Sequence, residues 1–272
     1  MGKNKILNID AMNIGDESEI NELKQRLARY YFASKIVRDE ANILDCACGN
    51  GYGSFLLSNI FKNSNFVSID SEYASIKKAQ NDFSKENIKF INDDLFNVEL
   101  ERESYDFVVS FETIEHVSDY EKFILLYKNI LKKDGVLIIS TPNKFLVSPN
   151  LKKPLNIFHI KEFEQEELQS LLEKHFSEVS PYVQRHNANK NILKFRQIVS
   201  RILSFSSHLN VVFLNVLRVI NSLLNKKVYV PVDNLNLNRL FNEDLSEDVF
   251  YPTKFIGQSK YEYLFEIFVC KK

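Results

Sequence analysis

The stretch from Ile43 to Ser54 has the residue types and spacing of a ligand-binding loop. It reads ILDCACGNGYGS, which predicts a buried strand over 43–47, a glycine-rich turn and a helix that begins near residue 52. Residues without a Cβ can take positive φ and let a ligand approach the backbone, and the helix start offers free N–H groups. This spacing alone is also consistent with a plain strand-to-helix turn.

The acid Asp70 limits which ligands this loop could bind. Asp70 ends the next expected strand, about twenty residues beyond the loop, where an acid holds the ribose hydroxyls of a nucleotide-like cofactor. This position suits NAD or S-adenosylmethionine. The loop lacks the last glycine of the dinucleotide fingerprint and starts instead on Asp45. S-adenosylmethionine carries no phosphate and needs donors for a carboxylate and acceptors for an ammonium, so the pattern favours it.

Apolar runs and helical patterns alternate along the chain and predict a parallel sheet buried on both faces. The expected strands are 43–47, 66–70, 89–92, 105–111, 136–141, 176–184 and 261–269. The expected helices are an N-terminal one over about 20–37, one from residue 52, and others over 73–85, 112–116, 121–132 and 165–174. The fold class is therefore doubly wound, Rossmann-like α/β, with ligands at the carboxyl ends of the strands.

Four segments follow from this reading. Residues 1–40 form an N-terminal helical segment, 41–184 the ligand-binding domain, 185–259 a mainly helical insertion or cap, and 260–272 the final strand of the sheet domain. The insertion is far longer than an ordinary connection between strands.

Composition excludes several classes of protein. The chain has 272 residues, 44% of them hydrophobic, and a net charge of -1, which gives no global sign of a nucleic-acid partner. Its three cysteines lack the spacing of a disulfide framework or a metal site and favour a reducing compartment. We see no signal-peptide pattern and no apolar run of about eighteen residues, so a cytoplasmic protein is expected.

Four motifs together resemble the class I S-adenosylmethionine-dependent methyltransferases, especially the branch common in bacterial surface-polysaccharide clusters. They are DCACGNGYGS from Asp45, SFETIEH from Ser110, STPNK from Ser140 and NIFHIKE from Asn156. The resemblance covers about residues 25–184 and includes Arg29 and Tyr30. The sequence departs from this branch at Asn50, where an acid is expected, and at Ile157, where proline is expected.

The resemblance implies a cofactor site that can be placed residue by residue. It consists of Arg29, Tyr30, Asp45, Cys48, Gly49, Gly51, Tyr52, Asp70, Asp94, Leu95, Ser110 and Phe111. Asp70 would hold the ribose hydroxyls, and Asp94 with the Leu95 backbone would read the adenine. Asp45 either contacts the cofactor ammonium or anchors the loop through backbone N–H groups. Asp93 is expected to cap a helix or turn.

His159, His116 and Glu112 are the expected catalytic residues. A sugar hydroxyl needs a base as its proton leaves, and a neutral imidazole suits that role, although either histidine could instead be structural. Glu112 and His116 stand at i and i+4 of an expected helix, as a base, a metal site or a stabilising pair. No third metal ligand is evident in the sequence, so no metal is expected.

Acceptor binding is assigned to Asn143, Lys144, Lys161 and Arg185, whose cations would suit a phosphorylated acceptor. Residues 179–232 contain no acid, and an apolar stretch over 209–220 accompanies their positive charge. That insertion could be a lid, a homodimer contact or a helix at the inner face of a membrane, and a packed helical cap is the plainer interpretation.

The expected reaction is O-methylation of a sugar, nucleotide sugar or glycan phosphate, with a small-molecule or glycan acceptor and no nucleic-acid partner. The alternatives are methylation of another small molecule, such as a quinone precursor or an amino sugar, and a non-catalytic cofactor-binding partner of a glycan assembly complex.

Overall fold

The computed structural model describes residues 17–149, 151–185, 251–256 and 263–272. Its centre is one sheet of eight strands in the order β3-β2-β1-β4-β5-β8-β6-β7. The parallel strands are β1 (Asn42–Cys46), β2 (Asn65–Asp70), β3 (Ile88–Asn92), β4 (Tyr105–Phe111) and β5 (Leu131–Pro142). Antiparallel pairing adds β8 (Tyr263–Lys271) to β5, β6 (Glu178–Arg185) to β8 and β7 (Thr253–Lys254) to β6.

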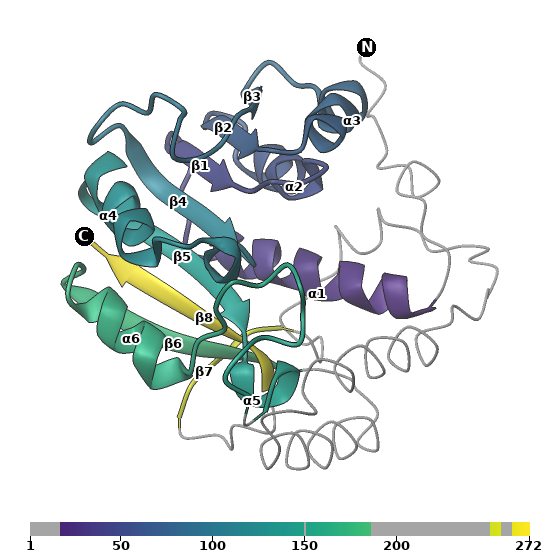
Figure 1. Ribbon diagram of the computed structural model, residues 1–272. Helices are drawn as coiled ribbons and strands as arrows, with labels where there is room; N and C mark the ends of the chain where they lie inside the picture. Colours follow the sequence, from purple (N-terminus) through teal and green to yellow (C-terminus); the bar gives the residue numbers. More distant parts are fainter. Residues whose placement is uncertain (1–16, 150, 186–250, 257–262) are drawn as a thin grey trace.

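Helices pack on both faces of this sheet (Figure 1). Side chains of α1 (Glu17–Ser34), α2 (Tyr52–Ile60) and α3 (Tyr73–Phe83) join one hydrophobic cluster, and those of α4 (Tyr120–Ile130) and α6 (Gln165–Glu173) join the other. Two short helices follow strands: the 3-10 turn η2 (Ile114–His116) after β4 and α5 (Lys144–Val147) after β5. The two clusters confirm the doubly wound α/β fold expected from the sequence.

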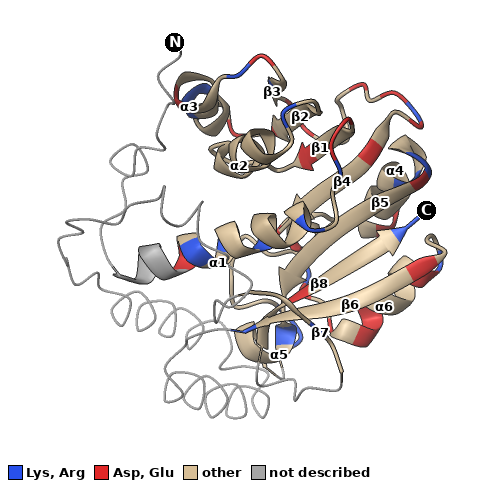
Figure 2. Cartoon of the chain, turned by 180° about the vertical axis from the view of Figure 1, so that it is seen from behind, with Lys and Arg blue, Asp and Glu red and all other residues tan. Residues whose placement is uncertain are grey.

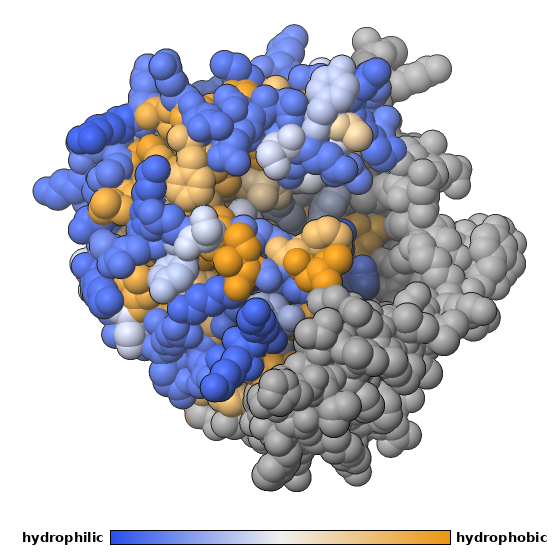
Figure 3. Space-filling view, in the orientation of Figure 1, coloured by the Kyte–Doolittle hydropathy of each residue, from blue (hydrophilic) through white to orange (hydrophobic). Residues whose placement is uncertain are grey.

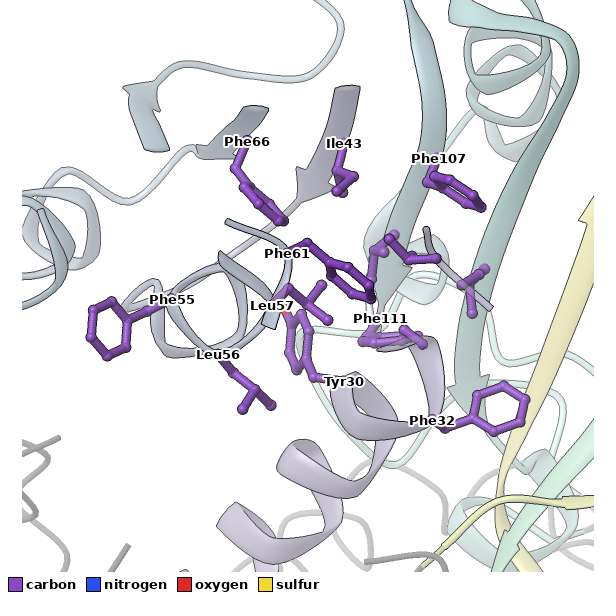
Figure 4. Close-up of a cluster of buried hydrophobic side chains, with 14 of the residues drawn as sticks. Tyr30, Phe32, Ile43, Phe55, Leu56, Leu57, Phe61, Phe66, Phe107 and Phe111 are labelled. Carbon is purple, nitrogen blue, oxygen red and sulfur yellow. The ribbon is translucent and has the colours of Figure 1, made fainter. Parts of the chain in front are cut away.

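The cluster on the α1 side shows why the loop after β1 needs a small residue at its last glycine. Leu57 of α2 and Phe61 just after it lie beside Tyr30 and Phe111 (Figure 4). A Cβ on Gly53 would lie 2.0 Å from the Tyr30 ring, so α1 and α2 can approach this closely only with glycine there.

We expect Gly53→Ala to lower the free energy of unfolding by about 2–3 kcal/mol, because the added methyl overpacks the contact with Tyr30. Gly49→Ala is the matched control: no atom lies within 4 Å of a Cβ there, and its φ of +53° costs an alanine about 1 kcal/mol. Urea unfolding of the ligand-free protein measures both. Equal losses in the two variants would contradict the packing argument.

Local structure differs from the expectation in three places. The expected helix over 112–116 is absent: Glu112 has a φ of +53°, and only the short turn η2 follows, so Glu112 and His116 do not share a helix face. The expected strand over 136–141 is present but longer: it begins at Leu131, and its register with β4 shifts between Tyr105 and Phe107. Residues 251–256, assigned to the insertion, supply β7 instead.

Most of the expected insertion, residues 186–250, lies outside the described residues. In the part of the chain that the structure describes, no helix has the length and apolar character needed to cross a membrane. Acidic and basic side chains are both spread over the described elements (Figure 2), in keeping with the net charge of -1.

Candidate active site

The loop after β1 is held to the end of β2. The backbone N–H of Gly49 donates to Oδ2 of Asp70 at 2.8 Å, and the N–H of Cys48 donates to the carbonyl of Ile69 at 3.0 Å. Beside Gly49, no atom of the described residues other than those of its chain neighbours lies within 4 Å of where its Cβ would be, so this part of the structure leaves its backbone accessible. Gly51 is different: a Cβ there would meet Phe90 at 2.6 Å. Gly49 is therefore the glycine that exposes backbone to a ligand.

The acids after β2 and β3 occupy the strand ends expected for them. Oδ1 of Asp70 also accepts a hydrogen bond from the N–H of Glu72 at 2.9 Å, which fixes its carboxylate beside the loop. Asp94 is exposed after β3, and its Oδ1 accepts the N–H of Phe96 at 2.8 Å. Oδ1 of Asp93 accepts the N–H of Asp94, as expected of a turn cap, and Leu95 packs partly into the core.

Asp45 is fully buried at the end of β1. The hydroxyls of Tyr30 and Ser54 donate to its carboxylate, and the Tyr30 oxygen lies 3.1 Å from Oδ1. The expected anchoring through backbone N–H groups is wrong, because the hydrogen-bond partners of this carboxylate are side chains of α1 and α2. Burial raises the pKa of Asp45 to about 7, although the two hydroxyls act against the shift.

Asp45→Asn should reduce the pH dependence of stability. The pKa of Asp45 is about 7 in the folded protein, above its value of about 4 in an unfolded chain, so the folded state binds the extra proton between those values. Its contribution to stability is present at low pH and is lost as the pH rises through about 7. Asparagine keeps an acceptor for both hydroxyls and cannot ionise.

Urea unfolding at about pH 5 and about pH 8 measures this effect. The variant should lose less stability between these two values than the wild type. The same loss in both proteins would contradict the assigned titration.

Helix α1 carries the two residues expected at the cofactor site, Arg29 and Tyr30, and one residue that the sequence analysis did not select. Arg29 is buried, donates to Oε1 of Gln184 at 2.7 Å and lies 4.3 Å from the centre of the Phe265 ring. Its Nε has no hydrogen-bond partner among the described residues, so a donor remains for an anionic ligand group. The unexpected residue is Arg26, which interacts with Tyr52 and Glu112 and has a raised pKa despite the opposing effect of burial.

After β4 the chain turns sharply toward β5. The hydroxyl of Ser110 is buried and accepts from Tyr127 of α4 at 2.8 Å, whereas Phe111 packs edge-on against Tyr30 with ring centres 5.1 Å apart. Ser140 Oγ donates to Oε1 of Glu112 at 2.7 Å. The φ of Glu112 is +53°, which is unfavourable for a glutamate. The fold therefore keeps this carboxylate in place although its backbone is strained.

Glu115, His116 and His159 come together beyond this turn. One oxygen or nitrogen atom from each lies within 4.8 Å of those of the other two, and the two imidazole ring centres are 4.9 Å apart. Thr141 Oγ1 donates to Oε2 of Glu115 at 3.0 Å. Burial, and then the charge of Glu112, raise the pKa of Glu115 well above its usual range. The sequence paired His116 with Glu112 and missed Glu115.

The four residues expected to bind an acceptor do not form one group. Asn143 is buried as the N-cap of α5: it accepts the N–H of Phe145 at 3.0 Å and donates to the Tyr263 carbonyl at 2.8 Å. Arg185 is exposed at the end of β6. The burial of Asn143 makes it a structural residue, so its expected contact with an acceptor is wrong.

Lys144 and Lys161 do share a surface pocket of about 380 Å³. Lys152 and Lys153 line it as well, together with Tyr120 and the acid Glu162. Lys144 pairs with Glu164 at 3.2 Å, and Lys161 pairs with Glu167 and lies over the Tyr120 ring. Glu162 also accepts a hydrogen bond from His159, so this basic pocket borders the histidine pair.

A family model described as a methyltransferase domain matches residues 38–268, which is most of the chain. The chain belongs to this methyltransferase family. Its cofactor is S-adenosylmethionine, the donor named for its relatives. The resemblance to class I methyltransferases is thereby confirmed, while the surface-polysaccharide branch is not.

Curated relatives match about half of the methyltransferase chain. A probable S-adenosylmethionine-dependent methyltransferase of Mycolicibacterium smegmatis is 33% identical over 132 residues, which cover 48% of this chain and 50% of the relative. A malonyl-[acyl-carrier protein] O-methyltransferase of Bacillus anthracis is 31% identical over 121 residues, which cover 44% of this chain and 43% of the relative. The chain spans about half the length of the curated relatives it matches.

The crystal structure of a SAM-dependent methyltransferase from Thermotoga maritima superposes with a TM-score of 0.55 at 19% identity, over 94% of each chain. This likeness confirms the Rossmann-like class I architecture.

The residues at the sheet edge fit this cofactor. The backbone at Gly49, the fixed carboxylate of Asp70 and the Nε of Arg29, which has no partner among the described residues, offer the groups that an amino acid and a ribose require. When bound, S-adenosylmethionine supplies an electrophilic methyl group on a sulfonium. The protein's part is to orient the acceptor, remove its proton and keep the site dry.

Proposed function

We propose that this methyltransferase transfers the methyl group to a hydroxyl of a sugar, nucleotide sugar or glycan phosphate. The observation that carries the proposal is the group formed by Glu115, His116 and His159 beyond β4, next to a basic pocket. An amine acceptor needs little more than desolvation, whereas a hydroxyl needs groups that take or polarise its proton. A relative named as an O-methyltransferase supports oxygen as the acceptor atom.

The two histidines are arranged to act through the same ring atom. Nδ1 of His116 lies 2.8 Å from the Phe158 carbonyl, and Nδ1 of His159 lies 2.8 Å from Oε1 of Glu162. A carbonyl accepts only, and an ionised carboxylate accepts only, so each Nδ1 carries a proton, and in its neutral form each imidazole presents a lone pair on Nε2. Either Nε2 can therefore act on an acceptor hydroxyl.

Exposed apolar residues accompany the histidines. Figure 3 shows apolar groups on a mostly hydrophilic face, and the large exposed ones of the molecule include Ile157, Phe158 and Ile160 from the loop that carries His159. Such side chains would cover an acceptor and exclude water from it. The basic pocket beside the loop supports an anionic group on that acceptor.

The direct experiment incubates the protein with S-adenosylmethionine and a panel of nucleotide sugars, phosphorylated glycans and neutral sugars. We expect a mass increase of one methyl group on a phosphorylated member of the panel. Malonyl-acyl carrier protein and an amino sugar belong in the same panel, because methylation of either one alone would overturn the proposed acceptor. No product with any acceptor, although the cofactor binds, would favour a non-catalytic binding partner.

Lys152→Ala combined with Lys153→Ala should raise KM for a phosphorylated acceptor by about 10-fold and leave kcat nearly unchanged, because these exposed cations act on binding. Lys174→Ala, an exposed lysine at the end of α6, is the control. The increase in KM caused by the double lysine substitution should be smaller at high salt, which screens these charges. An equal change in KM for a neutral sugar would show that the lysines do not recognise a phosphate.

The proposed peripheral membrane contact and homodimer depend on the insertion. Sedimentation with phosphatidylglycerol vesicles, compared with neutral vesicles, tests the first, and the molar mass in solution tests the second.

A further inference from the structure

The group formed by Glu115, His116 and His159 has the composition of a metal site with two imidazoles and one carboxylate. His116 and Glu115 are adjacent in the turn η2, and His159 comes from a loop more than forty residues further on. One ligand atom from each lies within 4.8 Å of the others, and Nε2 of His116 is 3.9 Å from Oε1 of Glu115. Two chain segments therefore converge on one point.

The atoms available there are the ones that a metal needs. Thr141 already donates to Oε2 of Glu115, which leaves Oε1 facing His116. Both imidazoles carry their proton on Nδ1, fixed by the Phe158 carbonyl and by Glu162, so both present the Nε2 lone pair. A ligating histidine whose other nitrogen donates to a carboxylate or a carbonyl is the usual second layer of a metal site.

Burial and backbone hydrogen bonds fix one side of this group. The other side is open to solvent. The side chains of Glu115, His159 and Glu162 are 1%, 8% and 2% exposed, whereas that of His116 is 41% exposed. The N–H groups of Ile160 and Lys161 donate to the carbonyl of Glu115 at 2.7 and 3.1 Å, which ties the His159 loop to η2. A bound ion would keep positions open toward solvent and an acceptor.

We propose that Glu115, His116 and His159 bind one divalent transition-metal ion, and that an acceptor hydroxyl occupies an open position on it. Two imidazoles with one carboxylate favour ions such as Zn²⁺ or Co²⁺ over Mg²⁺, which prefers oxygen ligands. Metal–ligand bonds of about 2.0–2.2 Å require the three side chains to close by roughly 1 Å around the ion. Metal binding by these residues does not depend on the proposed O-methyl transfer. Only the role given to the acceptor hydroxyl rests on that proposed function.

In that role the ion polarises the acceptor oxygen and makes its proton easier to lose. The proton passes to the carboxylate of Glu112, the acceptor oxygen forms a bond to the methyl carbon, and the carbon–sulfur bond breaks. Its electron pair stays on sulfur, which gives S-adenosylhomocysteine and the methyl ether. Atoms and charges balance without any oxidant or reductant. The histidines then act as ligands, and the base is Glu112.

The test measures metal binding first, in the tag-free protein without cofactor or acceptor. We expect one equivalent of Co²⁺ with a visible ligand-field spectrum, displaced by Zn²⁺, and a Kd in the micromolar range or tighter. His116→Asn and Glu115→Gln should each weaken binding by at least about 100-fold, and Glu162→Gln by about 10-fold. His175→Asn is the control, because His175 lies at the end of α6 and outside the group.

Absence of a stoichiometric Co²⁺ or Zn²⁺ complex would overturn the proposal, as would unchanged binding in His116→Asn. The second readout is turnover on an acceptor found with the panel: chelation should abolish it, and Zn²⁺ or Co²⁺ should restore it. Unchanged turnover after chelation would overturn the ion's role in transfer. Failure to methylate any acceptor would count against the proposed function alone, since the metal titration needs no acceptor.

Discussion

Asp70→Ala should lower the affinity for S-adenosylhomocysteine by at least about 100-fold, measured by isothermal titration calorimetry. The carboxylate accepts the backbone N–H groups of Gly49 and Glu72 at 2.8 and 2.9 Å, so it fixes the loop after β1, and its proposed role is to hold the ribose hydroxyls of the cofactor. Loss of charge-assisted hydrogen bonds to two ligand hydroxyls costs about 1.5–3 kcal/mol each, and the released loop adds to that loss.

Asp82→Ala is the matched control, because Asp82 is an acid on α3 whose carboxylate pairs with Lys78 at 2.9 Å. The affinity of Asp82→Ala for S-adenosylhomocysteine should equal that of the wild type. Asp70→Asn should fall between the two, since an amide keeps one acceptor oxygen. Tighter binding of NAD than of S-adenosylhomocysteine by the wild type would contradict the cofactor assignment itself.

The sheet domain was predictable because its signals are local and repeated. Short apolar runs such as 105–111 are typical of strands buried on both faces of a parallel sheet, and a helical pattern follows most of them. The strand order then places Asp45, Asp70 and Glu112 at one edge, as the sequence indicated. The loop glycines were correctly singled out, but packing decides their separate roles: Gly53 faces a tyrosine from α1, which no local pattern reveals.

The histidine pair shows what a sequence pattern cannot supply. Spacing suggested that Glu112 and His116 share a helix face, but the chain after β4 takes a left-handed residue at Glu112 and then a 3-10 turn. The carboxylate beside His116 is therefore Glu115, which the pattern placed elsewhere on the helix. His159 joins through hydrogen bonds between its loop and η2, and such a contact is set by the tertiary fold.

Asn143 illustrates the opposite error. An asparagine after the fifth strand stands where acceptor residues gather in folds of this kind, and its type suits hydrogen bonding to a sugar. In the structure its side-chain amide donates a hydrogen bond to the Tyr263 carbonyl of β8, a strand more than a hundred residues away in the chain. Only the antiparallel return of β8 beside β5 creates that partner, so local reasoning had no access to it.

His159→Ala and His116→Ala should each lower kcat by about 100-fold or more while the affinity for S-adenosylhomocysteine stays nearly unchanged. Both imidazoles present Nε2, and their hydrogen-bond partners, the Phe158 carbonyl and Glu162, belong to the loop of His159 rather than to the edge that carries Asp70. A group that acts on the acceptor proton or holds an ion for it affects transfer, whereas cofactor binding depends on the loops that carry Gly49 and Asp70. Turnover with a panel-derived acceptor and calorimetry measure the two effects separately.

His175→Ala is the control, because it removes an imidazole that lies near Glu121 and away from the pair. Unchanged affinity for S-adenosylhomocysteine in His159→Ala also shows that the variant is folded, which matters because His159 is only 8% exposed. Normal kcat in both variants of the pair would remove the histidines from the reaction. A loss of cofactor affinity equal to the loss of kcat would instead assign them to holding the sheet edge, because a residue that acts only on the acceptor leaves binding of the methyl donor intact.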